Sequence, residues 1–173
     1  MTAERPGVTA EAGAAVVTAA GCLLLAAPLG LLWAGVSPRV EVVVAAPGDV
    51  DLTDPTTTGF IAADGTFLLL AVLVGIATGL AAALLGRRYG VGVVVGLVLG
   101  GLLGAEVARR TGQLVGAEEA RSAVEAGREG VVELAVRLRA RSAQVGWAVA
   151  ALATHMVVTV LRPDPAEPAL SSG

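Results

Sequence analysis

Residues 65–106 read GTFLLLAVLVGIATGLAAALLGRRYGVGVVVGLVLGGLLGAE, and this stretch decides the fold. The pair Arg87–Arg88 divides it into two uncharged runs, the second of which ends at Glu106. About 20 apolar residues in a helix cross the ~30 Å hydrocarbon core of a bilayer, and an ion at its centre costs at least several kcal/mol. We therefore predict two membrane-spanning segments, 65–86 and 90–106, joined by a tight turn.

Two further uncharged runs flank this pair and predict spans at 14–36 and 143–161, the latter with His155 as its single ionisable side chain. Backbone groups in lipid must be satisfied within their own segment, and the alternation of barrel strands is absent from these runs, so each span should be an α-helix. The predicted fold class is an all-α integral membrane protein, with a four-transmembrane-helix bundle at 13–162. An alternative interpretation makes the first span a cleavable secretory signal.

Composition agrees with a membrane protein and excludes several functions. Apolar residues make up 55% of the 173 residues, charged residues only 16%, and the mean hydropathy is +0.77, more than a soluble core of this size needs. The net charge of −3 gives no sign of a nucleic-acid partner. One cysteine and one histidine argue against a metal site, a disulfide framework or a Cys/His nucleophile. We therefore predict no catalytic residue, no metal and no cofactor, with the lipid bilayer as the surrounding partner.

Antiparallel neighbours place the loops 37–63 and 107–142 on one face of the membrane, where we predict a small cap of short β-strands and a short helix. The first strand is expected at 39–44, because Arg39–Val40–Glu41–Val42–Val43–Val44 is β-branched and partly alternating. Residues 133–141 alternate strictly and predict a second strand, with Glu41 opposite Arg137 or Arg139. The alternative makes 131–141 a helical lead into the last span.

Three other segments complete the predicted organisation. Charged and small residues bounded by glycines at 116–127 predict a short surface helix in the second loop. The segments 1–12 and 163–173 are expected to be disordered tails, the first of them cytoplasmic.

The orientation in the membrane follows from charge, and the two available criteria disagree. Eight arginines lie on the loop face and four on the face that holds the termini and the turn, which favours cytoplasmic loops. The loop face also carries eleven acids, however, and Arg87–Arg88 is a strong local anchor. We predict a multi-pass protein of the cell membrane with cytoplasmic termini. Four aromatic residues at the loop-side ends of the spans predict an interfacial belt there: Trp33, Phe60, Phe67 and Trp147.

Small residues recur every four positions in the two central spans. Positions four apart share one helix face, and small residues there let helix backbones approach closely in lipid. We predict that these faces form a tight hairpin between the two spans, or alternatively that they support a homo-oligomer or a pore. The residues of this predicted packing set are Ala71, Gly75, Gly79 and Ala83 in the second span and Gly92, Gly96, Gly100 and Gly104 in the third.

Two polar residues are candidates for function. Asp64, just before the second span, is expected to cap the amino terminus of that helix, or alternatively to meet a cation or a partner at the membrane surface. His155 is expected to be neutral and hydrogen-bonded to a backbone carbonyl or to Thr154 or Thr159, or alternatively to carry protons.

The segment Pro38–Arg39–Val40–Glu41–Val42, followed by Phe60–Ile61–Ala62–Ala63–Asp64–Gly65–Thr66–Phe67, resembles an uncharacterised actinobacterial family of small four-helix membrane proteins, a domain of unknown function. The resemblance covers about 15–162, including the arginine-bearing turn and the glycine-rich third span. It implies a four-helix membrane fold, and it carries over no activity, cofactor or catalytic residue. Relatives often have tryptophan where this chain has Thr66.

Three classes of function follow from these patterns. The first is a non-enzymatic accessory or scaffold protein that presents an extracytoplasmic cap to a membrane-protein partner. The second is a subunit of a small channel or transporter, which the glycine faces and Pro28 would serve. The third, an enzyme, lacks any nucleophile–base pair, metal cluster, phosphate loop or carboxylate dyad in the sequence. We predict the first.

Overall fold

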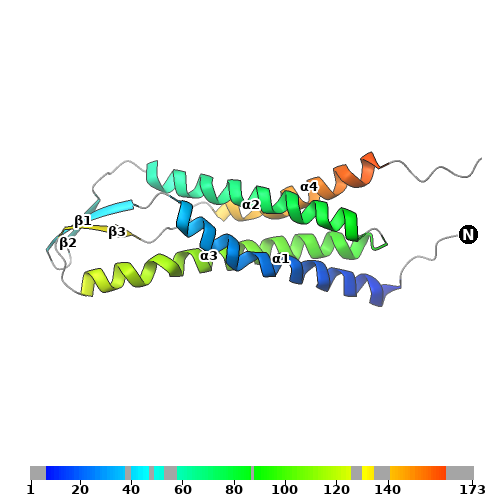
Figure 1. The fold of residues 1–173 in the computed structure, drawn as a ribbon, viewed down its shortest axis with the longest axis horizontal. Coiled ribbons are helices and arrows are strands. Elements are labelled where there is room, and N and C mark those ends of the chain that lie inside the picture. The colour runs from blue at the N-terminus through cyan, green and yellow to red at the C-terminus, as the bar shows by residue number, and fades with distance from the viewer. Residues whose placement is uncertain are drawn as a thin grey trace, which may run out of the picture.

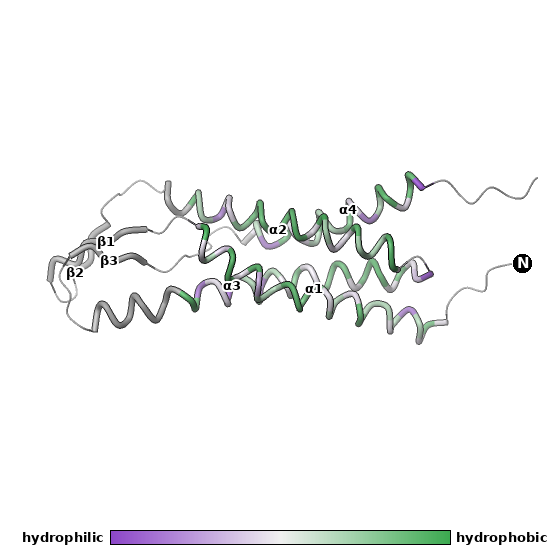
Figure 2. The backbone as a smooth tube through the Cα atoms, in the orientation of Figure 1, coloured by the Kyte–Doolittle hydropathy of each residue, from purple (hydrophilic) through white to green (hydrophobic). Residues whose placement is uncertain are grey.

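The computed structural model describes residues 7–37, 40–46, 49–52, 58–86, 88–125, 130–134 and 141–162. Four helices run beside one another along the long axis of the molecule (Figure 1), and each is long and apolar enough to cross a membrane. Figure 2 shows that hydrophobic residues predominate along all four. Their bounds are α1 Val8–Val36, α2 Thr58–Leu85, α3 Val91–Glu125 and α4 Val145–Leu161.

The helices extend further than the sequence predicted at three ends. Helix α1 begins at Val8, so the end of the predicted tail 1–12 is helical, and α2 begins inside the predicted loop 37–63. Helix α3 continues without a break to Glu125 and therefore absorbs most of the predicted surface helix 116–127. These boundaries were wrong because charge marks where a helix leaves lipid, and a helix does not have to end there. The tail 163–173 lies outside the described residues.

Charged side chains explain why α3 continues beyond its predicted end at Glu106. The guanidinium groups of Arg109 and Arg110, three and four residues later, each lie 2.6 Å from a carboxylate oxygen of Glu106. Pairs at this spacing stabilise a helix by a few tenths of a kcal/mol each. The apolar part of α3, Val91–Val115, is 25 residues long, so the third candidate span is longer than predicted.

The four helices form two parallel pairs, α1 with α3 and α2 with α4, and the two pairs run in opposite directions (Figure 1). Along α1 and α3, contacts advance together from Glu11 and Gly92 at one end to Trp33 and Gly112 at the other. The predicted hairpin of tightly packed second and third spans is therefore wrong. A five-residue turn joins α2 to α3, but each packs mainly on a helix that is distant in sequence.

Three short strands pair in the order β2–β1–β3: β1 Val40–Ala46, β2 Asp49–Leu52 and β3 Gly130–Leu134. Both pairings are antiparallel, and Figure 1 shows the strands beyond the end of the bundle where α1 ends and α2 begins. The register places Glu41 opposite Glu133, so the predicted partners of Glu41 are wrong because β3 starts earlier than expected. Arg137 and Arg139 lie outside the described residues. That this sheet forms an extramembrane cap stays a prediction.

Aromatic residues form the core at the strand-side end of the bundle. Trp33, Phe67 and Trp147 are each 0% exposed, and the rings of Trp33 and Phe67 meet edge to face with centroids 5.1 Å apart. The indole N–H of Trp33 donates to the carbonyl of Ala63 at 3.0 Å. The predicted interfacial belt is therefore wrong for these three residues, because they fix α1 and α4 to α2 inside the protein. The side chain of Phe60 lies outside the described part.

Candidate functional site

The small residues of α3 face α1, where they allow the two backbones to meet. A Cβ atom added at Gly96 would lie 2.6 Å from the carbonyl oxygen of Ala15, and one at Gly100 would lie 2.8 Å from the Cα of Ala19. Gly92 lies against the backbone of Glu11 in the same way. A Cβ added at Gly104, the last of the predicted set in α3, would lie 3.1 Å from the indole ring of Trp147. Close approach of this kind provides the packing that associates helices in lipid.

The small residues of α2 likewise allow its backbone to approach that of α4. A Cβ added at Gly75 would lie 2.6 Å from the carbonyl oxygen of Trp147, and Gly79 lies against the backbone of Ala151. Ala71 and Ala83, the other two members of the predicted set, are buried. The small-residue faces of α2 and α3 are thus each covered by another helix of the same chain. The eight residues of the predicted packing set are therefore used in contacts within the chain.

Asp64 does not lie where the sequence predicted a cap. Helix α2 begins at Thr58, so Asp64 lies in the second turn of the helix, and no acidic residue lies in the first turn. The predicted amino-terminal cap is therefore wrong, because the helix starts seven residues earlier than the predicted span 65–86 that was used to place it. Asp64 is half-buried, one residue after Ala63, which accepts the indole hydrogen bond of Trp33.

His155 is half-buried in the middle of α4. Its Nδ1 atom is shielded from the outside and has no hydrogen-bond partner among the described residues. The hydroxyl of Thr159 donates to the backbone carbonyl of His155 at 2.7 Å. Its hydrogen therefore goes to the main chain of His155, whereas one predicted arrangement paired a threonine with the imidazole ring.

A groove of about 670 Å³ lies between α1 and α2, with α3 as its floor. Its α1 wall runs from Ala10 to Leu25, its α2 wall from Thr78 to Gly86, and Tyr89 lies in its lining near the turn. The groove lies on the turn side of the contact between Trp33 and Phe67, which holds α1 and α2 together at the strand-side end. Towards the turn each of these helices follows its own partner. This groove is not among the sites predicted from the sequence.

The lining of the groove is uncharged along its length. Small residues of α1 supply much of one wall, including Gly13 and Gly21, where an added Cβ would meet nothing within 4 Å. Thr78, a polar member, has its hydroxyl occupied: it donates to the carbonyl of Val74 at 2.9 Å and accepts from the indole of Trp147 at 3.2 Å. The run of small residues at 10–21 was the available signal for this site, because small residues on a lipid-exposed helix leave space.

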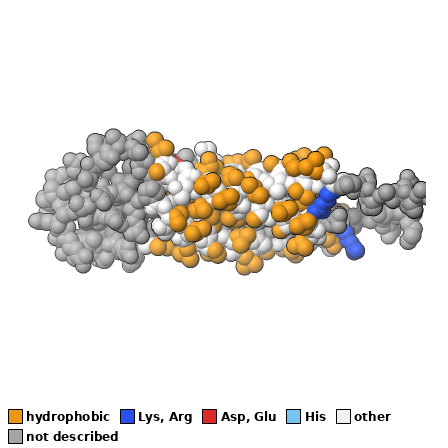
Figure 3. All heavy atoms as spheres, turned by 45° about the horizontal axis from the view of Figure 1, so that its top comes forward, with side chains coloured by type: hydrophobic (Ala, Val, Ile, Leu, Met, Phe, Trp, Pro, Cys, Tyr) orange, Lys and Arg blue, Asp and Glu red, His pale blue; other side chains and the backbone are white. Residues whose placement is uncertain are grey.

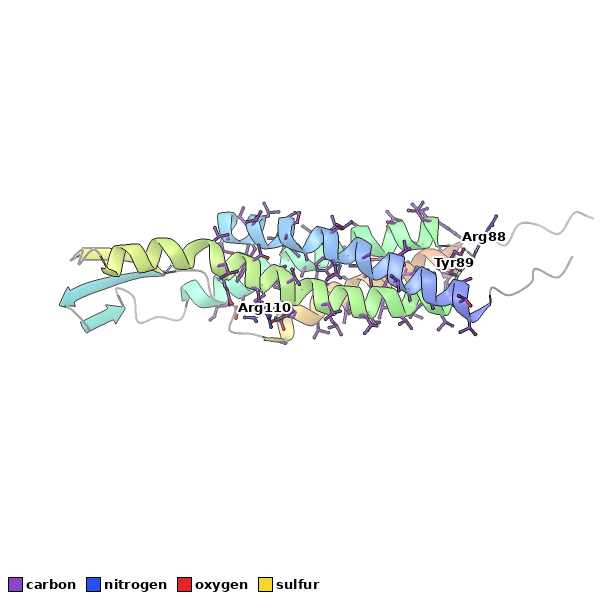
Figure 4. The ribbon with its side chains drawn as sticks, turned by 90° about the horizontal axis from the view of Figure 1, so that it is seen from below. Arg88, Tyr89 and Arg110 are labelled. Carbon is purple, nitrogen blue, oxygen red and sulfur yellow. The ribbon has the colours of Figure 1, made fainter. Side chains whose placement is uncertain are left out.

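Charged residues lie near both ends of the apolar bundle. Figure 4 places Arg88 and Tyr89 at the turn end and Arg110 towards the strand-side end. Figure 3 shows one face of the bundle, on which hydrophobic side chains cover the surface and basic side chains gather at one end. Near the strand-side end, Gln144 of the 3-10 turn η1 (Arg141–Gln144) donates to Glu106 at 2.9 Å and so connects α3 to the start of α4. Such an arrangement places charges beside both interfaces of a membrane.

At the turn end, charged side chains from one helix bind the end of another. The carboxylate of Glu11 in α1 accepts hydrogen bonds from the backbone N–H groups of Gly90 and Gly92 at the start of α3. The guanidinium of Arg162, which follows α4, donates to the carbonyl of Ala83 near the end of α2 at 2.8 Å. An anion at a helix amino terminus and a cation at a carboxyl terminus both complement the helix dipole. Both residues lie just outside the predicted spans 14–36 and 143–161, and neither contact was predicted from the sequence.

Replacement of Glu11 by alanine is expected to lower the free energy of unfolding by about 1 kcal/mol, the usual value of a helix cap. Glu11→Gln keeps one acceptor oxygen but removes the charge, so its loss should be smaller. Thermal unfolding in detergent micelles, followed by circular dichroism, provides the measurement. Equal melting temperatures for the wild type and the alanine variant would contradict this capping role.

Within the described ranges, no group of three or more His, Cys, Asp and Glu side chains could hold a metal ion. Four helices of sufficient length and hydropathy are compatible with the class of multi-pass membrane proteins. Comparisons of the chain with models of protein families, with curated proteins and with solved structures find no match.

Proposed function

We propose that the protein is a non-enzymatic, multi-pass protein of the cell membrane that acts as an accessory or scaffold for another membrane protein. Its termini lie in the cytoplasm, and the loops 37–63 and 107–142 form an extracytoplasmic cap that contacts the partner. We also propose membership of the actinobacterial four-helix family described above. Pairing of β1 with β3 supports the cap, because it joins the two loops into one sheet.

The observation that carries this proposal is the filled interior of the bundle. The small-residue faces of α2 and α3, which could otherwise line a pore, are in backbone contact with α4 and α1. A conducting path needs polar groups or water along its length. The described residues that line the groove between α1 and α2 are uncharged; its polar members are the isolated Thr18, Thr78 and Tyr89, and the Thr78 hydroxyl is already bonded. A bundle of this kind anchors and positions other parts of a protein.

A subunit of a small channel or transporter is the second candidate, and His155 is the observation in its favour. A titratable side chain within a span is by default a functional hypothesis, and Nδ1 of His155 has no partner in the described part of the chain. Coupled proton transport also requires a group that exchanges the proton. The described residues that line the groove include no carboxylate and no histidine.

Topology and flux measurements test the proposal together. A fluorescent protein fused after residue 173 is expected to fluoresce and alkaline phosphatase at the same position to be inactive, because both report a cytoplasmic terminus. Proteoliposomes that contain the purified protein are expected to show the proton and potassium leak of empty liposomes. Active phosphatase would reverse the orientation, and a leak that His155→Leu abolishes would favour the transporter.

The scaffold role itself is tested by recovery of a partner. We expect one other membrane protein to copurify in equal amount, and to be lost when 40–52 are replaced by a glycine–serine linker of equal length. The linker variant must still elute as a single species in detergent, which shows that the bundle remains folded. Recovery of the same protein by wild type and linker variant alike would contradict the proposed cap.

A further inference from the structure

We propose that the groove between α1 and α2 binds one acyl chain of an anionic phospholipid, whose phosphate is held at Arg88 and Tyr89. The groove lies within the candidate spans and far from the strands. This inference therefore stands independently of the partner proposed for the cap.

The dimensions of the groove favour a single hydrocarbon chain. From Ala10 to Leu25 the α1 wall measures about 22 Å at 1.5 Å per residue, which exceeds the ~15 Å hydrocarbon depth of one leaflet. A groove volume of about 670 Å³ over that length admits one extended alkyl chain.

The chemistry of the lining selects an apolar occupant. Val17 and Leu25 of α1 and Leu85 of α2 line the groove and are also exposed on the outer surface of the bundle, so the groove opens towards lipid. Along its length the described lining has two threonines, Thr18 and Thr78; Thr78 directs its hydroxyl hydrogen to its own helix, and burial leaves Cys22 as a small hydrophobic residue. An occupant with polar groups along its length would lose hydrogen bonds to water without replacing them.

Residues at the turn end of the groove can bind the phosphate of a lipid headgroup. Arg88 is exposed beside Tyr89, which lines the groove, and Figure 4 shows both residues at the same end of the bundle. An arginine guanidinium forms paired, charge-assisted hydrogen bonds with phosphate, and a tyrosine at a membrane interface can donate its hydroxyl hydrogen. The carboxylate of Glu11 at this end is already bound by the N–H groups of Gly90 and Gly92. The local charge available to a headgroup is therefore positive.

Filling the groove tests the site, and two glycines allow it without a clash. Leucine at Gly13 and Gly21 would project into open space of the groove, because an added Cβ at either position meets nothing within 4 Å. Gly35→Leu is the matched control, since Gly35 lies on the same helix, has the same open space and does not line the groove. All three changes raise helix propensity equally. Gly21→Leu alone serves as a second, milder variant.

The measurement is native mass spectrometry of protein extracted in mild detergent from vesicles of equal phosphatidylglycerol and phosphatidylcholine. We expect wild type and Gly35→Leu to retain one phospholipid, mainly phosphatidylglycerol. The double variant Gly13→Leu/Gly21→Leu should retain at least about tenfold less, and Gly21→Leu an intermediate amount. Arg88→Gln should retain the lipid but lose a preference of about tenfold for phosphatidylglycerol, which corresponds to one charged hydrogen bond.

Equal lipid retention by the double variant and the Gly35→Leu control would overturn the proposal. An unchanged headgroup preference in Arg88→Gln would remove the assigned phosphate contact. If the double variant instead changed the mass of a protein oligomer without changing the bound lipid, the groove would be a contact between chains and the lipid proposal would be wrong.

Discussion

Replacement of Trp33 by alanine is expected to lower the free energy of unfolding by about 3–5 kcal/mol, the usual cost of deleting a buried aromatic side chain. Trp33 is 0% exposed, meets Phe67 edge to face and donates its indole hydrogen to the carbonyl of Ala63. It also lies directly against Gly112 of α3. Its removal therefore leaves a cavity where three helices meet.

Two further variants separate the causes of this loss. Trp33→Phe keeps an aromatic ring but leaves the Ala63 carbonyl without its indole donor, so a smaller loss of about 1–3 kcal/mol is expected. Leu24→Ala is the matched control on the same helix, because Leu24 is 79% exposed and its loss should change stability by less than about 0.5 kcal/mol. Denaturant unfolding in detergent micelles, followed by circular dichroism, gives all three values. If Trp33→Ala unfolded at the same denaturant concentration as Leu24→Ala, the aromatic core would not hold the bundle.

The number and position of the helices could be predicted from the sequence because lipid sets a strict rule. Every backbone group within the hydrocarbon core must be bonded within its own segment, so a long uncharged run there has one solution, a helix. The rule says nothing about where such a helix ends after it leaves the lipid. At Glu106 the first charge ended the predicted span, whereas α3 continues past it, with Glu106 paired to Arg109 and Arg110.

The choice of helix partners could not be predicted from the same patterns. Recurrence of small residues in 71–83 and 92–104 identifies a face suited to close packing, but any other helix with a small-residue face fits it equally well. The short turn after α2 favoured α3 as its partner. The decisive contacts are instead with Ala15 in α1 and Ala151 in α4, and no periodicity within one helix encodes the identity of its neighbour.

The candidate site was missed for a related reason. A groove is a property of two diverging helices, and it depends on where Trp33 holds them together as much as on the small residues that leave it open. Polar residues such as Asp64 and His155 attract attention in a sequence because a charge in lipid is costly. Here the space lies elsewhere, along the uncharged face that contains Gly13 and Gly21. A site for an apolar ligand carries no such polar marker.

Alanine at Gly75 or Gly96 is expected to reduce the free energy of unfolding by about 1–3 kcal/mol through overpacking. The new methyl group at Gly75 would lie 2.6 Å from the Trp147 carbonyl oxygen, and that at Gly96 would lie 2.6 Å from the Ala15 carbonyl oxygen. Both neighbours are backbone atoms, so a whole helix must move to make room. Higher helix propensity offsets at most about 1 kcal/mol of this cost.

The sign of the change distinguishes this packing from ordinary effects of glycine in a helix. Gly35→Ala gains the same helix propensity at a position with nothing within 4 Å of the added Cβ, so its stability should stay the same or rise by up to about 1 kcal/mol. Thermal unfolding and light scattering of the three variants in the same detergent provide the test. If Gly75→Ala lowers the unfolding temperature, Gly35→Ala does not, and the mass of the protein by light scattering stays constant, the glycine face packs within one chain. If Gly75→Ala lowered the mass of an oligomer and left the unfolding temperature unchanged, the face would pack between chains and the parallel pairs described here would be wrong.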